Sequence, residues 1–450
     1  MAYKELIEKI FYRGKELGLG DMEVYIRGNK LFDVMIFQGE IDKYSISDEV
    51  GLSFRGVYNG KMGYSYTEKV DETSIDMLIK EAIENAVTID SEDEEEIFEG
   101  SKEYKEVNTY NSELENITAL QKIEFAKAVE KAALEADKRV TSVNYCLFEE
   151  IAEHTILTNT KGLNLESKSN VAIAYVSVVV KDGNDVKTGA SYILSNDFSK
   201  FNAEKLALEA VKEALSMLGA ESIESGTYPV ILRNDVAANI LESFVSIFVA
   251  ENVQKNLSLL KGKLNEKIAN ELITLVDDPF LEGGVASSSF DGEGVATKYK
   301  KVIDKGVLKT FLYNNKTAKK DGVESTGNAS KASYKSPVGI SPTNMYIENG
   351  FTTVDDMIKS IDKGIMIIDV QGLHSGVNAV SGDFSLSSYG YLIENGKITR
   401  PVNQITIAGN FFEMLNNIEL VGNDLKFILP KSGYMGSPSL KVNSLAISGK

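Results

Sequence analysis

The chain has 450 residues, 43% of them hydrophobic, and a formal net charge of −18 from 66 acidic and 48 basic residues. This length and composition predict two or three folded domains rather than a disordered chain. The acidic balance disfavours nucleic acid and anionic membranes as partners, because both are bound by cationic surfaces.

The sequence predicts no membrane span and no secretion signal. Its longest apolar run, Val171–Val180, is much shorter than the roughly 20 residues that cross a bilayer. The first residues mix charges at helical spacing and lack an apolar signal core. The single cysteine, Cys146, excludes an internal disulfide, so we expect a cytoplasmic protein.

The chain begins with a predicted helix, a run of strands and a second helix. Residues 3–17 carry apolar side chains at helical spacing, and short alternating segments typical of strands follow to about residue 67. Within them YNGK, Tyr58–Lys61, predicts a tight hairpin turn, because Asn-Gly tolerates positive φ. The second helix is expected over Thr73–Val87, with Thr73 as its N-cap.

The same pattern returns further along the chain. A helix is predicted over Ala119–Asp137, strand-like segments follow it, and a helix over Ala203–Leu218 completes the set. The similar stretches KEAIENA, from Lys80, and LEAVKEA, from Leu208, occupy equivalent places, as an internal duplication would produce.

We therefore expect an N-terminal α+β domain over residues 1–223. It should contain two helix–β-meander–helix units, at about residues 1–90 and 119–218. The acidic run DSEDEEE, Asp90–Glu96, predicts an exposed linker between the two units.

A second α+β domain, dominated by antiparallel sheet, is expected over residues 224–450. A strand at Tyr228–Arg233 precedes one long helix that begins near Asn234. After about residue 275 the chain consists mostly of alternating segments and glycine-bearing loops, with hairpin signals such as the Asn-Gly turn in YLIENGKITRPV.

The side chains that most hydrolases use are scarce. The only histidines, His154 and His374, are 220 positions apart, so no helix can present a histidine pair to one metal ion. His154 and Cys146 both lie in predicted strands, where a structural role is expected. The sequence contains no G-x-S-x-G elbow and no phosphate-binding P-loop.

One polar loop is the best candidate for contact with another molecule. GVNAVSGDFS, Gly376–Ser385, precedes the strand that leads into the Asn-Gly hairpin, and His374 lies just before it. A binding role and a packing role both remain open for this loop and for His374.

The C-terminal half carries a set of motifs that together resemble the TldD/TldE (PmbA) peptidase family. The motifs are STGNASK (Ser325–Lys331), GVNAVSGDFS (Gly376–Ser385), YLIENGKITRPV (Tyr391–Val402), ITIAGNFFEMLNNIELVGNDL (Ile405–Leu425) and GSPSLKV (Gly436–Val442). The family resemblance implies one of two kinds of chain. TldD-like chains bind zinc through H-E-x-x-x-H on a helix and a later cysteine, and TldE-like chains pair with them and lack those ligands.

The resemblance places this chain with the second kind. Aligned backward from NELITLVDD (Asn270–Asp278), the motif positions fall on LESFVS, so that Leu241 and Ser246 stand in place of the histidines and Glu242 remains. Residues i and i+5 lie about 140° apart on a regular α-helix, so the family motif needs a bulge that a metal would help to hold. Without histidines we expect a straight helix here.

Glu242 is then a relic of the motif, or it faces solvent or pairs with a nearby lysine such as Lys255. The cysteine ligand is also absent before GSPSLKV, so the resemblance implies no metal and no cofactor in this chain, with zinc in the partner subunit. A lone glutamate does not activate water as a metallopeptidase does.

The resemblance therefore implies a TldE/PmbA-like subunit, inactive alone, that joins a TldD-like partner in a heterodimer or higher assembly and acts on unfolded or extended peptides. We expect His374, Asn378, Ser381 and Asp383 to contact substrate or partner. The alternative is a homodimeric, non-catalytic peptide-binding protein.

Overall fold

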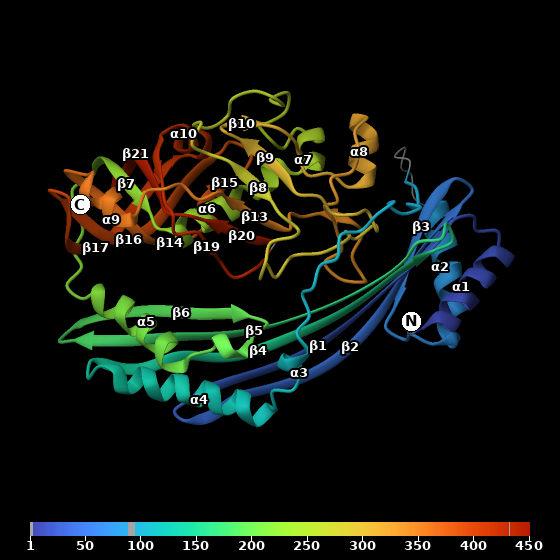
Figure 1. Ribbon diagram of the computed structural model, residues 1–450, viewed down its shortest axis with the longest axis horizontal. Coiled ribbons are helices and arrows are strands. Elements are labelled where there is room, and N and C mark those ends of the chain that lie inside the picture. Colours follow the sequence, from blue (N-terminus) through green and yellow to red (C-terminus); the bar gives the residue numbers. More distant parts are fainter. Residues whose placement is uncertain (1–2, 89–94, 432) are drawn as a thin grey trace.

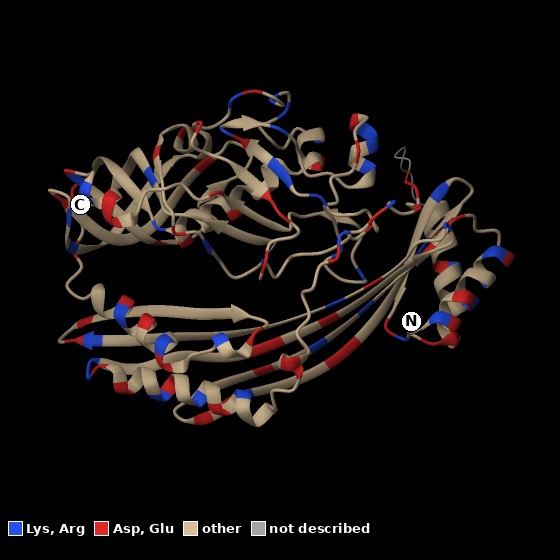
Figure 2. Cartoon of the chain, viewed as in Figure 1, with Lys and Arg blue, Asp and Glu red and all other residues tan. Residues whose placement is uncertain are grey.

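The computed structural model describes residues 3–88, 95–431 and 433–450. Figure 1 shows a long, curved sheet formed by the N-terminal half and a strand-rich body formed by the C-terminal half, which lies over the concave face of the sheet. Acidic and basic side chains are distributed along this sheet as well as on its helices (Figure 2). None of the helices in the described part of the chain is long and apolar enough to cross a membrane.

The two predicted N-terminal units share one six-stranded antiparallel sheet. Its order is β3-β2-β1-β4-β5-β6, so each unit contributes three consecutive strands and the first strands of the two units pair at the centre. The duplicated helix–meander–helix arrangement is thus confirmed, and it has one continuous sheet. The strands are β1 (Met22–Phe37), β2 (Glu40–Tyr58), β3 (Lys61–Thr67), β4 (Val140–Asn159), β5 (Asn164–Asp182) and β6 (Asp185–Ser195).

Helices cover the convex face of this sheet in two groups. The first group is α1 (Lys4–Glu16) and α2 (Ile75–Thr88), and the second is α4 (Ala119–Ala136) and α5 (Ala203–Ser216), at the two ends of the sheet (Figure 1). Because side chains alternate along a strand, even-numbered residues of β1 pack under the helices and odd-numbered ones face the C-terminal body. Short segments complete this half: η1 (Glu72–Ser74), α3 (Ser112–Glu115) and η2 (Phe198–Lys200).

Local signals behave as expected in most of this half. Asn59 and Gly60 in the YNGK turn both have positive φ, 50° and 78°, as an Asn-Gly hairpin requires. The N-cap prediction was wrong: the cap is Asp71, whose carboxylate accepts a hydrogen bond from the Thr73 N–H at 2.8 Å, two residues earlier than expected. A short 3₁₀ turn precedes α2 and moves the cap back.

The C-terminal body contains two larger sheets and one strand pair. Most of its strand pairs are antiparallel, although β14 pairs with β7, and β13 with β20, in parallel. The predicted Asn-Gly hairpin is confirmed as β16–β17, with positive φ at Asn395 and Gly396. The first sheet holds β7 (Gly226–Leu232), β14 (Lys363–Gln371), β15 (Val377–Asn378), β16 (Asp383–Glu394), β17 (Lys397–Asn410), β18 (Ile418–Val421) and β21 (Leu440–Ser448).

The remaining elements surround a large apolar core. The second sheet holds β8 (Leu275–Asp277), β9 (Lys300–Asp304), β10 (Val307–Leu308), β13 (Asn344–Ile347), β19 (Lys426–Phe427) and β20 (Tyr434–Ser437). The pair is β11 (Ala329–Ser330) with β12 (Gly339–Ile340), and the shorter helices are α8 (Asn315–Asp321), α9 (Val354–Lys359) and α10 (Phe411–Asn416).

The helix after β7 differs from the expectation of one straight helix. It divides into α6 (Asn234–Phe244), a 3₁₀ turn η3 (Val245–Phe248) and α7 (Ala250–Gln254). Val249 is extended, and the Leu312 segment exchanges hydrogen bonds with the Phe248 carbonyl and the Ala250 N–H at 2.9 and 3.0 Å. Phe244 stacks on Phe411 with ring centroids 4.4 Å apart. The helix therefore ends where the Leu312 segment of the same chain supplies hydrogen-bond partners to its backbone.

Both repeats bring a helix unusually close to an edge strand through a glycine. A Cβ at Gly63 in β3 would lie 1.8 Å from the Ala82 carbonyl oxygen of α2, and one at Gly189 in β6 would lie 2.4 Å from the Ala210 oxygen of α5. The repeated stretches KEAIENA and LEAVKEA thus carry the alanines, Ala82 and Ala210, at which each helix touches its edge strand.

We predict that Gly63→Ala and Gly189→Ala each destabilise the protein by about 1–3 kcal/mol, because the helix must move away from the sheet. Urea unfolding of the full chain would measure the loss. Gly20→Ala is the matched control, since its Cβ would meet its nearest atom at 3.6 Å, an ordinary contact. Equal midpoints for all three variants would contradict the packing described above.

Candidate functional site

A cluster of buried charges joins the sheet to the C-terminal body. Glu23 on β1 and Arg55 on β2 lie directly opposite each other, and the guanidinium donates to both carboxylate oxygens at 2.7 and 3.1 Å. From the C-terminal body, Glu293 approaches Arg55 at 3.8 Å and the Lys331 ammonium approaches Glu23 at 3.9 Å. All four side chains are buried. Glu23 and Arg55 therefore compensate each other within the sheet, and each also lies near an opposite buried charge from the other half.

Burial changes the ionisation of this cluster. Loss of solvation lowers the pKa of Lys331 to about 8, although Glu23 and Glu293 oppose the change. The ammonium also lies 4.4 Å from the centre of the Tyr25 ring, a cation–π contact across the two halves. Lys331 ends the STGNASK motif, so this motif carries a side chain that holds the two halves together.

Asp291 organises the loop that carries Glu293. Its carboxylate accepts hydrogen bonds from the N–H groups of Glu293, Val295 and Ala329 at 2.9, 3.0 and 2.9 Å. Burial and the adjacent Glu293 carboxylate nevertheless raise the pKa of Asp291 to about 7. The carboxylate thus fixes both the Glu293 loop and the strand that precedes Lys331.

A polar cleft of about 720 Å³ opens beside this cluster, between the concave face of the sheet and the C-terminal body. Arg27 on β1 lines this cleft, and its guanidinium donates to the backbone oxygens of Lys331 and Ala332 at 3.0 and 3.2 Å and forms an ion pair with Glu153. Loops with many hydroxyl groups form much of the rest of the lining, and residues 107–110 and 166–169 complete it from the other half: the loops are residues 285–292, 327–332 and 341–343. Such walls offer hydrogen bonds to a peptide backbone without demanding particular side chains.

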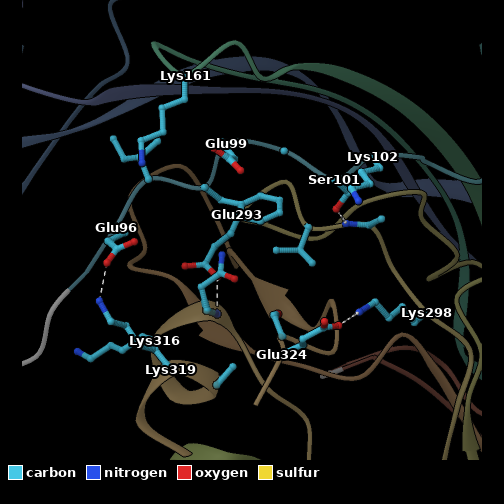
Figure 3. Close-up of a pocket in the computed structure, with 18 of the residues that line it drawn as sticks. Glu96, Glu99, Ser101, Lys102, Lys161, Glu293, Lys298, Lys316, Lys319 and Glu324 are labelled. Atoms are coloured by element: carbon cyan, nitrogen blue, oxygen red, sulfur yellow. Dashed lines mark hydrogen bonds and ion pairs between the residues drawn. The ribbon is translucent and has the colours of Figure 1, made fainter. Parts of the chain in front are cut away.

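A second cavity, of about 1000 Å³, is lined by Glu293 (Figure 3). One wall is the segment from Glu95 to Glu103, and the opposite wall is α8. Lys316 of α8 pairs with Glu95 at 3.3 Å, and Lys319 pairs with Glu96. The segment is also fixed to the C-terminal body, because the Ser101 hydroxyl accepts from the Ala296 N–H at 2.9 Å.

These contacts bear on the acidic run that was expected to be an exposed linker. Residues 90–94 of that run lie outside the described residues. Glu95 and Glu96, which follow them, are not simply solvated but form the ion pairs with α8.

The predicted binding loop is a tight, self-supported hairpin. Asn378 accepts hydrogen bonds from the N–H groups of Val380 and Ser381 at 3.0 and 3.2 Å. Asn410 on β17 donates to Asp383 at 2.9 Å and to the Ser381 carbonyl at 3.0 Å, and the bond to Asp383 lowers the pKa of that carboxyl. The structure thus brings Asn378, Ser381 and Asp383 together.

His374 lies on the preceding turn and is exposed. In the described part of the chain, none of the four predicted contact residues lines the polar cleft or the larger cavity. The loop is therefore an outer surface of the C-terminal body, separate from both.

Glu242 has a different partner from the one considered in the sequence. Its side chain is only 9% exposed. One carboxylate oxygen accepts a hydrogen bond from the Lys431 ammonium at 2.8 Å and forms an ion pair with it. The other oxygen is buried without a hydrogen-bond partner among the described residues. Lys255 pairs instead with Glu251 at 2.6 Å, because α6 ends before that turn and directs Lys255 elsewhere.

The surroundings of Glu242 do not fit a zinc ion. Leu241 is buried in the apolar core and Ser246 lies in the 3₁₀ turn, so neither flanking position offers an imidazole. Across residues 3–88, 95–431 and 433–450, no three His, Cys, Asp or Glu side chains are grouped so as to hold a metal ion. Cys146 is remote from this helix: its buried thiol donates to the Ala126 carbonyl, and burial raises its pKa to about 12.

Sequence reasoning missed the buried charge cluster. Glu23 and Arg55 appear as ordinary polar positions of alternating strands, and Lys331 is 308 positions from Glu23. The alternation of apolar and polar residues places Glu23 and Arg55 on the polar side of their strands, but no local pattern marks that side as buried.

We predict that Arg55→Leu lowers the free energy of unfolding by about 3–5 kcal/mol, because Glu23 remains buried without its main partner. Chemical unfolding would measure the change. The double variant Glu23→Gln/Arg55→Leu should lose less than the single variant, since the uncompensated charge is then absent. The control is Lys30→Met, which removes an exposed pair with Asp48 and should hardly shift the midpoint. If Arg55→Leu left the free energy of unfolding unchanged, the cluster would not be what holds the two halves together.

Comparison with known proteins covers nearly the whole chain. The models for the PmbA/TldA metallopeptidase domain 1, central domain and C-terminal domain match residues 22–86, 112–218 and 225–449. In Buchnera aphidicola, a metalloprotease PmbA homolog is 28% identical over 90% of this chain and 88% of that protein, and a metalloprotease TldD homolog is 29% identical over 97% and 93%. The crystal structure of TldE from Thermococcus kodakarensis is 25% identical, with a TM-score of 0.91 over 98% of this chain and all of that one. The chain therefore belongs to the TldD/PmbA metallopeptidase family.

Proposed function

We propose that this chain is the TldE-type subunit of a two-component metallopeptidase and contributes no zinc site of its own. One observation carries the proposal. At the helix positions where TldD-like chains have H-E-x-x-x-H, this chain has a core leucine, a carboxylate paired with Lys431, and a serine in a 3₁₀ turn.

The chemistry of zinc explains why these replacements matter. A catalytic zinc site needs three protein ligands and an open position for water, and the metal supplies the large decrease in the pKa of that water. Glu242 is already bound to an ammonium group and has no imidazole beside it. Hydrolysis in this proposal therefore takes place on a TldD-like partner that carries the zinc.

The rest of the chain would help to enclose and present the substrate. The polar cleft has walls of backbone and hydroxyl groups, which suit an unfolded or extended peptide of varied sequence. The loop with Asn378, Ser381 and Asp383, and the nearby His374, would contact the partner or its substrate from the outer surface. We place this assembly in the cytoplasm, in keeping with one buried, reduced cysteine.

We predict that the purified chain holds no stoichiometric zinc. Elemental analysis after dialysis against a weak chelator would measure it, with a histidine-bearing TldD-like chain treated in the same way as the positive control. One tightly held zinc per chain would refute the proposed absence of a site.

We also predict that the chain alone does not cleave unstructured peptides, and that co-expression with a TldD-like chain gives an equimolar complex with chelator-sensitive activity. Size-exclusion chromatography and cleavage of a fluorescent peptide would measure both. Chelator-sensitive cleavage by the lone chain would contradict the proposal. A stable homodimer that binds peptides and ignores every TldD-like chain would favour a peptide-holding protein.

A further inference from the structure

Among the described residues, the C-terminal body contacts the concave face of the long sheet near each of its two ends. At one end Tyr25 and Arg27 meet the Lys331 loop, and at the other the Tyr192 hydroxyl donates to the Phe427 carbonyl at 2.9 Å. Between these contacts, the residues of β1, β4 and β5 that point to the concave side are half-buried at most positions. They include Leu31, Met35, Leu147, Ile151, Val171 and Ile173.

One edge of this region is open. Residues 52–58 of β2 pair with β3, but among the residues that the structure describes no strand pairs with the outer side of residues 40–50. An unpaired edge presents a row of backbone N–H and C=O groups to which another extended chain can add.

The second repeat shows how the equivalent edge is used. Residues 172–182 of β5 pair with β6, and its preceding stretch is an edge like that of β2. There the chain supplies its own extended segment: Thr109 bridges Ser169 in parallel, and its carbonyl accepts from the Asn170 N–H at 3.1 Å. The edge that an internal segment covers in one repeat is thus uncovered in the other.

An acidic acceptor lies beside the open edge. Asp33 on β1 is directly opposite Ser45 of β2 on one side and Glu149 of β4 on the other. The Asp33 side chain is only 6% exposed, and Lys43 binds one of its oxygens from a largely exposed position. The other oxygen is buried and has no partner in the described chain.

Glu149 has neither an ion pair nor a hydrogen bond among the described residues, and burial together with the Asp33 carboxylate raises its pKa. Two adjacent carboxylates with one external lysine leave a net negative site. Tyr145, 41% exposed, and Tyr175 form an edge-to-face pair at 5.7 Å on the same face, which adds aromatic surface next to it.

We propose that an extended polypeptide substrate adds to the β2 edge at residues 40–50 and places a lysine or arginine side chain over Ser45 against Asp33, where Glu149 adds a second negative charge behind it. The added strand would lie about 10 Å from β1, two strand spacings away. Only a long side chain bridges that distance, and the small Ser45 leaves its path open. The cation would pair with the Asp33 carboxylate and offset the negative charge that Asp33 and Glu149 together place there.

This inference rests on the proposed peptide-handling function and names the substrate class: extended segments that carry basic residues. It is tested with the full chain and two end-blocked, fluorescent peptides of eleven residues. One has lysine at every second position, and the other has norleucine, which is uncharged and similar in length. Fluorescence anisotropy measures both dissociation constants at two salt concentrations.

We expect the lysine peptide to bind about tenfold more tightly, as one charge-assisted hydrogen bond network would provide. Glu149→Gln removes the second negative charge behind Asp33, and Ser45→Arg supplies Asp33 with an internal cation, so each should reduce the preference to about threefold or less. Glu135→Gln, on the outer side of α4, removes the same charge and should leave the preference unchanged. Circular dichroism and urea unfolding would establish that the variants are folded.

Three results would overturn the inference. Equal affinity for the two peptides would show that no cation is recognised, while leaving the peptide-handling function intact. A lysine preference that survives both Glu149→Gln and Ser45→Arg, or falls equally in Glu135→Gln, would place recognition elsewhere or in the net charge. If neither peptide binds, both the inference and peptide handling by this chain fail, whereas assembly with a TldD-like partner is measured separately.

Discussion

The buried pair of Glu23 and Arg55, with Glu293 and Lys331 from the other half, is the interaction on which the arrangement of the molecule depends. Each charge would be costly if it were buried alone, so Glu23 and Arg55 pair within the sheet and each also contacts an opposite charge from the other half. Both cavities open beside this cluster, since Lys331 lines the polar cleft and Glu293 lines the larger one. The geometry of the cleft is therefore set by ion pairs between the halves as well as by the fold of either.

The end of α6 determines the position of the backbone around Glu242 and Ser246. Because Leu312 exchanges hydrogen bonds with Phe248 and Ala250, the helix does not continue through Ser246. The segment around Glu242 is instead fixed by core packing and by the pair between Glu242 and Lys431. Under the proposed function, the scaffold would keep the shape of a peptidase while apolar contacts occupy the places of its ligands.

Much of the fold could be predicted from the sequence, because its signals are local. Helical spacing located α1, α4 and α5 to within about two residues, the Asn-Gly turns located two hairpins, and the repeated alanine-rich stretches revealed the duplication. The misses have nonlocal causes. The break after Phe244 depends on a neighbour almost seventy positions away, and the partner of Glu242 is Lys431 rather than Lys255. The buried charges needed the packing of two halves that no window of sequence contains.

The central pairing of β1 with β4 has a consequence for how the chain is made. Ile26 pairs with Ile156, so the sheet cannot close until more than a hundred further residues have left the ribosome. Until then β1, which lies at the centre of the finished sheet, is an unpaired edge strand of the first three strands. An unpaired edge of this kind is prone to misassociation. Long-range strand pairing also slows folding. Folding of this protein during synthesis would accordingly benefit from early protection of the nascent first repeat, by a chaperone or by rapid synthesis of the α3–α4 region.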